Sequence, residues 1–191
     1  KKTMNYLIGD IGNTNIKICK INNKFKIINT YLFDTKNLSL EKDLNNKLKQ
    51  IKNVNINNKV LFSSVVPKAY KKIEKIFKRK KFKVFEIKKF NLKKVMKFNV
   101  KKYSQLGSDR IANAIGINEK FKTNCIVIDF GTATTFDVIK KNAIYDGGVI
   151  APGIKLSIEN LFSSAALLPM FKLNKYPNNY GKDTKEALSS G

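Results

Sequence analysis

The chain has 191 residues, 42% of them hydrophobic, so it can bury the core of one large domain or of two small ones. Its formal net charge of +24 at pH 7 favours contact with nucleic acid. Of its 38 basic residues, however, only Arg79 and Arg110 are arginines, and specific contacts to nucleic acid prefer the arginine fork. We therefore interpret most lysines as solvated surface and expect no specific nucleic-acid partner.

Two cysteines and no histidine limit the chemistry that the chain can perform. Cys19 and Cys125 both lie in apolar runs, which is typical of buried thiols in a reducing compartment. They are too few for a zinc cluster, and acid–base chemistry must fall to carboxylates. No apolar run reaches the length of a membrane span and no secretory signal opens the chain, so we expect a cytoplasmic protein without a membrane partner.

Strands and helices alternate in the first part of the chain. The apolar patterns predict strands over 5–10, 15–21 and 25–33 with a turn at Asn22-Asn23, a helix over 39–52, a strand over 59–66 stopped by Pro67, a helix containing 69–77, and a strand over 82–87. This order, β-β-β-α-β-α-β, is that of a ribonuclease-H-like domain, in which three antiparallel strands meet two parallel ones.

The second part of the chain repeats only some of these elements. Residues 88–104 carry many lysines without a clear period, which indicates a linker or a loop at an inter-domain cleft. The pattern then predicts a helix over 105–121, strands at 125–128 and 136–139, a turn at 140–142, a run at 143–145, a glycine-rich turn over 146–153 and a helix over 154–165 ended by Leu167-Leu168-Pro169. We predict domains at 1–104 and 105–191, the second being either abbreviated or incomplete.

One supersecondary unit occurs twice, at Tyr6–Asn15 and at Cys125–Thr135. Each copy has an apolar strand, an aspartate at the strand end, a glycine, and then hydroxyl or amide side chains. Such a turn offers donors to phosphate, and its carboxylate can hold a cation. A single copy is equally typical of an ordinary hairpin turn. Two copies favour a duplicated fold with a phosphate chain between its halves.

Six motifs in order give the chain a resemblance to the type III pantothenate kinases, which belong to the acetate kinase, sugar kinase, chaperone ATPase and actin superfamily. The motifs are Asp10–Thr14, Ser63–Pro67, Gly107–Arg110, Asp129–Thr135, Gly147–Gly153 and Asp183-Thr184. The resemblance covers nearly the whole chain. It implies an α/β, duplicated ribonuclease-H-like (actin-like ATPase) fold with two lobes around a nucleotide cleft, the second lobe being incomplete here.

The resemblance also implies an activity, cofactors and an assembly. The expected reaction is phosphorylation of the 4′-hydroxyl of pantothenate by ATP, the first step of coenzyme A biosynthesis. The expected cofactors are ATP with Mg²⁺ and a monovalent cation, K⁺ or NH₄⁺. The expected assembly is a homodimer.

The family's functional residues map onto named positions of this chain. Asp109 would be the proton acceptor, Asp129 the ligand of the monovalent cation and Asp10 the residue near magnesium. Pantothenate would be bound by Tyr103, Gly107, Ser108, Asp109, Arg110 and Thr184. ATP would be bound by Asp10, Ile11, Gly12, Asn13, Thr14, Asn15, Ile16, Lys17 and Thr132.

Several of these residues also have plain structural interpretations. Arg110 can pair with the pantothenate carboxylate as a fork, or with a neighbouring acid as an ordinary helix ion pair. Asp109 is suited to proton transfer, but a helix N-terminus favours an acid in any case. Asp137 is either an acid near the site or a solvated strand residue. Tyr103 either lines the pantothenate pocket or simply packs.

The sequence departs from the family pattern in two places. Val100 stands where family members usually carry a tyrosine, which is why Tyr103 becomes the candidate aromatic. Family chains also generally continue past the Ser-Gly at this terminus. Two alternatives remain: a regulatory or nucleic-acid-associated protein like the Bvg accessory factors, and a kinase of the same superfamily acting on a sugar or acetate. The motifs at Ser63–Pro67 and Gly107–Arg110 argue against the second alternative.

Overall fold

The computed structural model of the chain describes residues 4–37, 39–51, 55–165 and 180–190. The described residues belong to two compact units, one drawn from 1–128 with 135–149 and the other from 129–134 with 150–191. The domain boundary expected between residues 104 and 105 stays a prediction.

A five-stranded sheet forms the centre of the larger unit. Its strands are β1 (Asn5–Ile11), β2 (Asn15–Ile21), β3 (Ile27–Asp34), β4 (Ile56–Ser64) and β5 (Lys83–Glu86), in the spatial order β3-β2-β1-β4-β5. β1 pairs antiparallel with β2, and β2 with β3, whereas β4 pairs parallel with both β1 and β5. This arrangement confirms the predicted ribonuclease-H-like order.

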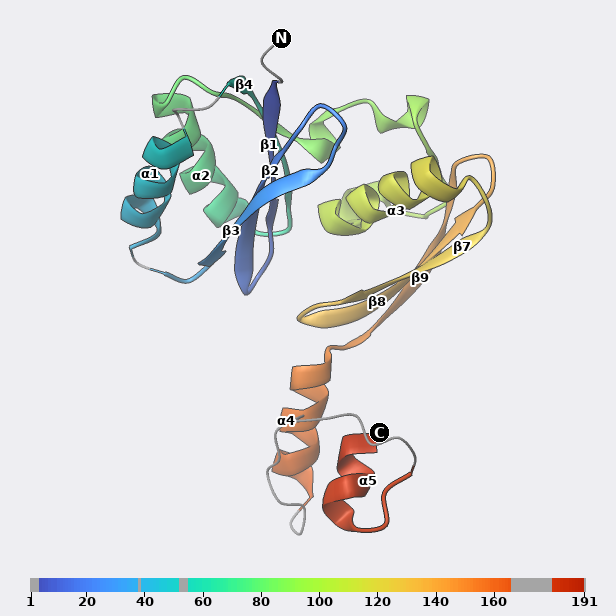
Figure 1. Cartoon of the computed structure of the whole chain (residues 1–191). Helices are drawn as coiled ribbons and strands as arrows, with labels where there is room; N and C mark the ends of the chain where they lie inside the picture. The colour runs from blue at the N-terminus through green and yellow to red at the C-terminus, as the bar shows by residue number, and fades with distance from the viewer. Residues whose placement is uncertain (1–3, 38, 52–54, 166–179, 191) are drawn as a thin grey trace. The chain divides into compact units, whose positions relative to one another are not determined.

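Helices α1 (Leu40–Ile51) and α2 (Pro67–Arg79) cover one side of this sheet, and α3 (Ser108–Phe121) lies on the other side (Figure 1). The apolar residues of α1 and α2 recur at helical spacing, so each helix presents one stripe to the sheet. The buried cluster beneath them contains Leu7, Ile11, Val60, Phe62, Leu40, Leu44, Leu48, Ile73, Ile76 and Phe77. Pro67, expected to stop the strand before it, opens α2, a position where its missing N–H costs nothing.

Gly9 allows the closest packing in this core. A Cβ atom at Gly9 would collide with the ring of Phe62, which packs edge-to-face on Phe77 with ring centroids 5.4 Å apart. The chain can therefore bring a large aromatic side chain directly beneath β1. Asp10, the next residue, leaves the core and is exposed at the end of the strand.

Tyr70 on α2 buries a hydroxyl group that has no hydrogen-bond partner among the described residues. Replacing Tyr70 with phenylalanine keeps the ring contact with Phe62 and removes this unpaired group. We expect the free energy of unfolding to rise by about 1 kcal/mol, because an unsatisfied buried hydroxyl costs roughly 1–3 kcal/mol. Chemical denaturation of both proteins at pH 7 measures the difference, and a loss of stability in Tyr70→Phe would contradict it.

The same substitution has a pH signature. Burial, with the negative charges of Glu74 and Glu86, raises the pKa of Tyr70 from 10.0 to about 12. A raised pKa means that the folded state holds the proton more tightly than the unfolded chain does. Its contribution is complete below pH 10 and is lost as the pH rises towards 12. The stability advantage of Tyr70→Phe should therefore grow over that interval.

Two details of the first part differ from prediction. Phe25, placed in a strand from the sequence, occupies a left-handed turn conformation (φ 58°) and is 80% exposed. Asn22 makes this wider turn, because its side-chain oxygen accepts hydrogen bonds from the amides of Lys24 and Lys26 at 2.9 and 3.0 Å. The helix expected over 39–52 is α1, and residue 52 lies outside the described residues.

The expectation of a linker at 88–104 is wrong. This segment contains 3₁₀ turns at Leu92–Lys94 and Tyr103–Gln105 and the short strand β6 (Lys97–Phe98). Leu92 and Met96 are buried beside α3, in a cluster with Leu106, Ile111, Ala114, Ile139 and Tyr145. Their spacing is irregular because they come from turns, which hides the apolar residues from a search for helical or strand periods.

A second sheet follows the order β6-β9-β8-β7. Its longer strands are β7 (Cys125–Phe130), β8 (Ala133–Lys140) and β9 (Ile144–Pro152). The glycine-rich turn predicted over 146–153 is wrong, because residues 146–152 continue β9. Gly148 serves close packing within the strand, whereas Gly147 has open space around it and a positive φ of 106°. Of the two cysteines, Cys19 is buried and Cys125 is half-buried.

Helix α4 (Ile154–Ser164) follows β9, and α5 (Thr184–Ser190) ends the described residues; both belong to the smaller unit. The Leu167-Leu168-Pro169 sequence expected to end the first of them lies outside the described residues. Within the described ranges, none of the helices is both long and apolar enough to cross a membrane.

Candidate functional site

The first copy of the repeated unit is the β1–β2 hairpin. The amide of Gly12 donates to the carbonyl of Asn15 at 2.9 Å, and the hydroxyl of Thr35 donates to the carbonyl of Gly12 at 2.8 Å. Asp10 stands opposite Lys17 in the strand register. Of the residues predicted to bind ATP here, Ile11 and Ile16 are fully buried. These two can offer a ligand only backbone atoms, whereas Asp10, Asn13, Thr14, Asn15 and Lys17 are exposed.

The second copy is built in the same way. The amide of Gly131 donates to the carbonyl of Ala133 at 3.0 Å, with Asp129 half-buried before the turn and Thr132 exposed within it. A Cβ atom at Gly153 would collide with the carbonyl oxygens of Gly131 and Thr132. Gly153, at the N-terminus of α4, thus fixes how closely the backbone approaches this turn. Both copies are hairpin turns that carry an aspartate at the strand end.

Asp109 lies in the first turn of α3, after Gly107 at the N-cap. Its Oδ1 atom accepts the backbone N–H of Arg110 at 2.7 Å. The helix macrodipole favours a negative charge at this end. A Cβ atom at Gly107 would collide with the Asp109 carboxylate and lie 3.6 Å from Val65, so the Ser63–Pro67 motif adjoins this turn.

Two side chains, one at the end of β5 and one in the turn after it, hold the start of α3. Glu86 is buried, and its Oε1 atom accepts the hydroxyl of Ser108 at 2.7 Å while Oε2 accepts the amide of Lys88 at 2.9 Å. The Lys88 ammonium donates to the carbonyls of Ser104 and Leu106 at 2.9 and 2.8 Å. Ser108 is therefore an anchor of the helix start, and Asp109 projects from that anchored turn.

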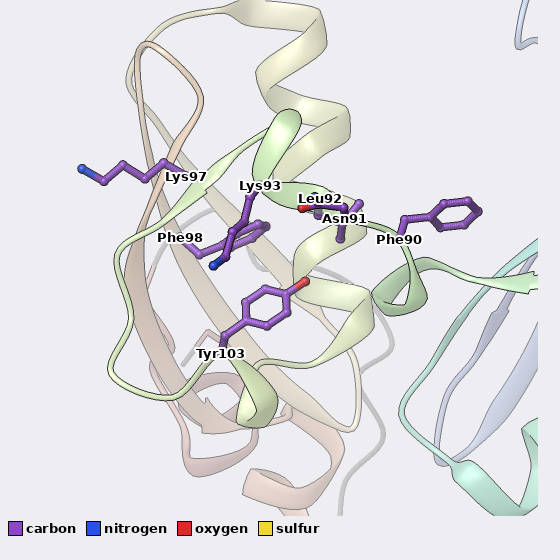
Figure 2. Close-up of a pocket in the computed structure, with 7 residues that line it drawn as sticks. All are labelled: Phe90, Asn91, Leu92, Lys93, Lys97, Phe98 and Tyr103. Carbon is purple, nitrogen blue, oxygen red and sulfur yellow. The ribbon is translucent and has the colours of Figure 1, made fainter.

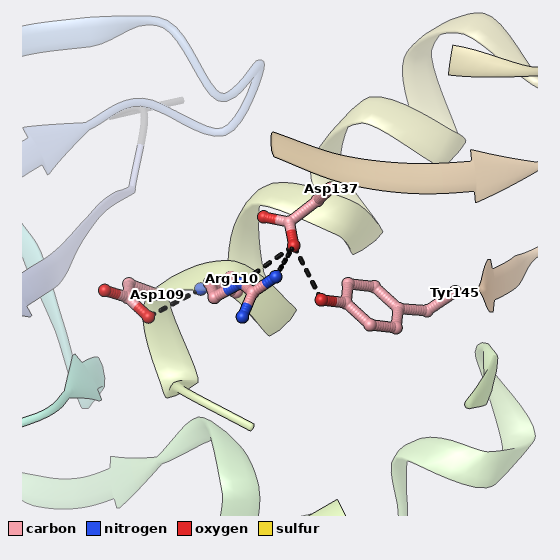
Figure 3. Close-up of polar contacts among 4 residues, drawn as sticks. All are labelled: Asp109, Arg110, Asp137 and Tyr145. Carbon is pink, nitrogen blue, oxygen red and sulfur yellow. Dashed lines mark hydrogen bonds and ion pairs between the residues drawn. The ribbon is translucent and has the colours of Figure 1, made fainter. Parts of the chain in front are cut away.

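Arg110 is bound to Asp137 of β8 (Figure 3). Its Nε and Nη2 atoms both reach the Oδ1 atom of Asp137, at 2.8 and 2.6 Å, and the Tyr145 hydroxyl donates to the same oxygen at 2.6 Å. The Asp137 side chain is 0% exposed and that of Arg110 is 14% exposed. The interpretation of Asp137 as a solvated strand residue is therefore wrong.

Electrostatics agree with this geometry. Burial alone would lower the pKa of Arg110, but the hydrogen bonds and charge of Asp137 raise it above the ordinary value. Burial raises the pKa of Tyr145 well above its ordinary value, and its bond to Asp137 adds to the shift. The group therefore consists of an arginine cation, an aspartate whose one oxygen accepts two hydrogen bonds and an ion-pair contact, and a neutral tyrosine.

A cavity of about 590 Å³ lies against this group. Arg110 and Tyr145 line it together with Asn99, Val100, Lys101, Lys102, Gln105, Leu106, Gly147 and Gly148. The lining contains three cationic side chains and no acidic one, so the cavity suits a small anionic ligand. Val100, the residue at the position of the family's tyrosine, contributes to this wall.

Tyr103 lines a different cavity, of about 520 Å³, among Phe90, Asn91, Leu92, Lys93, Lys97 and Phe98 (Figure 2). Its ring packs edge-to-face on Phe98 with centroids 4.9 Å apart. Burial, with the charge of Glu86, raises the pKa of Tyr103. A role for Tyr103 in pantothenate binding stays a prediction; its ring contacts Phe98 and lies beneath the Lys88 ammonium.

Thr184 is exposed at the start of α5. Asp183, the residue before it, caps that helix, since its side chain accepts the amide of Glu186 at 2.7 Å. Asp10, Asp109 and Arg110 belong to the larger compact unit, whereas Asp129, Thr132 and Thr184 belong to the smaller one.

Glu86, Lys88 and Tyr145 were not among the predicted site residues, and Asp137 was predicted only as one of two alternatives. A signal for Glu86 was present, because it is the sole carboxylate between Glu74 and Asp109 in a stretch rich in lysine. Tyr145 carried no such signal, because its hydroxyl acquires meaning only when β9 brings it beside Asp137.

A family model described as type III pantothenate kinase matches residues 6–191. The type III pantothenate kinase of Pelagibacter ubique is 47% identical over 187 residues, which cover 97% of this chain and 74% of that protein. The type III pantothenate kinase of a Sulfurihydrogenibium species is 39% identical over 134 residues, covering 70% of this chain and 53% of the relative.

Among solved structures, a protein from Campylobacter jejuni described as a Baf family transcriptional activator superposes with a TM-score of 0.53. It is 21% identical in sequence, and the match covers 96% of this chain and 71% of the other. At an identity this low, the structural likeness shows a shared fold alone and carries no information about activity.

Proposed function

Because this chain belongs to the type III pantothenate kinase family, we propose that it uses ATP to phosphorylate the 4′-hydroxyl of pantothenate, the first step of coenzyme A biosynthesis. One observation supports this assignment above others. The start of α3 presents Asp109 beside Arg110, and Arg110 borders a cavity whose charged side chains are all cationic. A carboxylate that accepts a proton and a basic site for a substrate carboxylate are thus adjacent residues.

Arg110 and Asp109 have different roles, the first in binding and the second in the reaction. Arg110 binds the pantothenate carboxylate through the part of its guanidinium that Asp137 does not use. Asp109 orients the attacking hydroxyl and accepts its proton, since the chain has no histidine for that role. Phosphoryl transfer depends mainly on positioning and on neutralising charge, so a carboxylate of ordinary basicity is sufficient.

The kinase family implies ATP and a divalent metal ion. We assign the ATP phosphates to the turn from Asp10 to Lys17 and to Thr132, with Asp10 near Mg²⁺. The donors at the first turn are carboxylate, amide and hydroxyl oxygens, which suit a hard cation. The described residues hold no cluster of three acidic, histidine or cysteine side chains, so Mg²⁺ would rely on Asp10, phosphate oxygens and water, as it commonly does. The ion would neutralise charge on the phosphates.

A monovalent cation is proposed at Asp129, where a half-buried carboxylate adjoins turn carbonyls and hydroxyls. We expect activation by K⁺ or NH₄⁺ and little by Na⁺, and Asp129→Asn should raise the cation concentration needed for half-maximal rate. Initial rates measured in the three chlorides at equal ionic strength test this. Equal rates of the parent protein in Na⁺ and K⁺ would contradict the proposed site.

The direct test of the function is release of ADP with and without pantothenate, measured by a coupled assay on the purified protein. The rival regulatory function predicts DNA binding with a sequence preference that survives physiological salt. A lysine-rich enzyme should instead show only a steep non-specific salt dependence. ADP release that does not depend on pantothenate would overturn the proposal.

We further propose a cytoplasmic homodimer in which Thr184 contributes to pantothenate binding. Thr184 is exposed at the start of α5 and is therefore accessible to a ligand or to a partner chain. Sedimentation analysis at assay concentrations tests this assembly, and a fully active monomer would contradict it.

A further inference from the structure

The Arg110–Asp137–Tyr145 group is held by more contacts than an ordinary surface ion pair. Three donor atoms, Arg110 Nε, Arg110 Nη2 and Tyr145 Oη, converge on one oxygen of Asp137. We propose that Asp137 and Tyr145 are positioning residues that fix the Arg110 guanidinium for binding a substrate carboxylate. This inference rests on the proposed function for the identity of that substrate, pantothenate.

Asp137 occupies one edge of the Arg110 guanidinium and leaves another edge available. Asp137 takes the edge formed by Nε and Nη2. Within the described residues, Nη1 makes no hydrogen bond, and Arg110 lines the cavity of about 590 Å³. A guanidinium held along one edge keeps a second edge, Nη1 with the remaining N–H of Nη2, for a carboxylate in a two-bond arrangement. Holding the first edge lowers the entropy lost when the second edge binds a ligand.

The guanidinium has little free space on the side that faces β9. A Cβ atom at Gly148 would collide with the Phe136 carbonyl, lie 2.5 Å from Arg110 Nη2 and lie 2.9 Å from Asp137 Oδ1. Only glycine at this position of β9 therefore leaves room for the pair. Gly148 also lines the cavity, so the strand that defines the wall also confines the arginine.

The contacts of Asp137 are poorly suited to a role in stabilising the fold alone. The second oxygen of Asp137, Oδ2, is buried and has no hydrogen-bond partner among the described residues. A buried carboxylate with one unsatisfied oxygen is costly, and buried ion pairs seldom stabilise a fold better than apolar residues of the same size. Such a cost is understandable if the aspartate, which holds Arg110 in Figure 3, serves to orient the guanidinium towards the cavity that Arg110 lines.

The test replaces Asp137 with asparagine, which keeps the size of the side chain and removes its charge. Steady-state kinetics are measured with pantothenate and with pantothenol, the analogue that carries a primary alcohol in place of the carboxylate. We expect KM for pantothenate to rise roughly 10–100-fold, the usual effect of losing a group that orients a binding residue, with kcat changed less than about threefold. KM for pantothenol should stay near the parent value. Glu119→Gln, on the exposed part of α3, the helix that carries Arg110, is the matched control and should change neither constant.

Tyr145→Phe provides a second variant that keeps the buried ring and removes one of the three donors. It should raise KM for pantothenate by a smaller factor, about two- to fivefold, and leave KM for pantothenol unchanged. Melting curves of both variants identify any general loss of folding. If Asp137→Asn fails to fold, the selectivity of Tyr145→Phe decides the question.

The outcomes separate this inference from the proposed function. An active parent whose KM for pantothenate is unchanged in both variants would overturn the positioning role and leave the kinase assignment intact. Equal losses with pantothenate and pantothenol would also overturn it, because they indicate a purely structural pair. A parent protein without pantothenate-dependent ADP release would contradict the proposed function itself.

Discussion

Replacing Asp109 with asparagine is expected to lower kcat for pantothenate by roughly 10²–10⁴-fold, the usual contribution of general-base catalysis. Asparagine preserves the shape of the side chain and an oxygen that can accept the Arg110 amide, now 2.7 Å from Asp109 Oδ1. It removes the basic oxygen. Oδ2 makes no hydrogen bond within the described residues, so it is the atom available to the pantothenate hydroxyl. Affinity for pantothenate should change little.

The measurement combines steady-state kinetics with calorimetric titration of pantothenate. Glu119→Gln serves again as a neutralised carboxylate on the same helix, and its kcat should equal that of the parent. If Asp109→Asn turns over at nearly the parent rate, Asp109 is not the base, and Asp10 and Asp129 become the carboxylates to test.

Regular elements of this fold could be predicted from the sequence because each has a simple period. The stripe Leu40, Leu44 and Leu48 locates α1, and the alternation around Ile16 and Ile18 locates β2. The segment from Ile87 to Gln105 could not be predicted in the same way. Its buried residues, Leu92 and Met96, lie in tight turns that have no period.

The candidate site residues also differ in whether they could be predicted from the sequence. Asp10 and Asp129 were predicted because an aspartate two residues before a glycine near a strand end has a local chemical meaning, whereas Asp109 was predicted from the family resemblance of the Gly107–Arg110 motif. The pairing of Arg110 with Asp137 could not be found, because 27 positions separate the two and only the placement of β8 beside α3 brings them together. Gly148 was assigned to a turn for a related reason: its role, leaving space for another side chain, depends on atoms remote in sequence.

The second large effect is expected from Arg110→Ala, and it combines a loss of binding with a loss of folding. Without Arg110, the fully buried Asp137 carboxylate would keep, among the described residues, only the Tyr145 hydroxyl as a partner. Breaking a buried pair on one side costs about 3–5 kcal/mol, because it leaves a charge that is neither solvated nor paired. This is a large part of the total stability of a typical domain, which is about 5–15 kcal/mol. Urea denaturation should therefore show a much lower midpoint.

The double variant Arg110→Ala with Asp137→Ala separates the two effects. Removing the aspartate as well removes the unpaired buried charge, so the double variant should be more stable than Arg110→Ala alone, by about 2 kcal/mol or more. It should still fail to bind pantothenate, because the guanidinium proposed to contact the substrate carboxylate is absent. Calorimetric titration under conditions where the double variant is folded tests this. Recovery of pantothenate affinity together with stability would mean that Arg110 acts only on folding, whereas recovery of stability alone assigns its free guanidinium edge to the substrate.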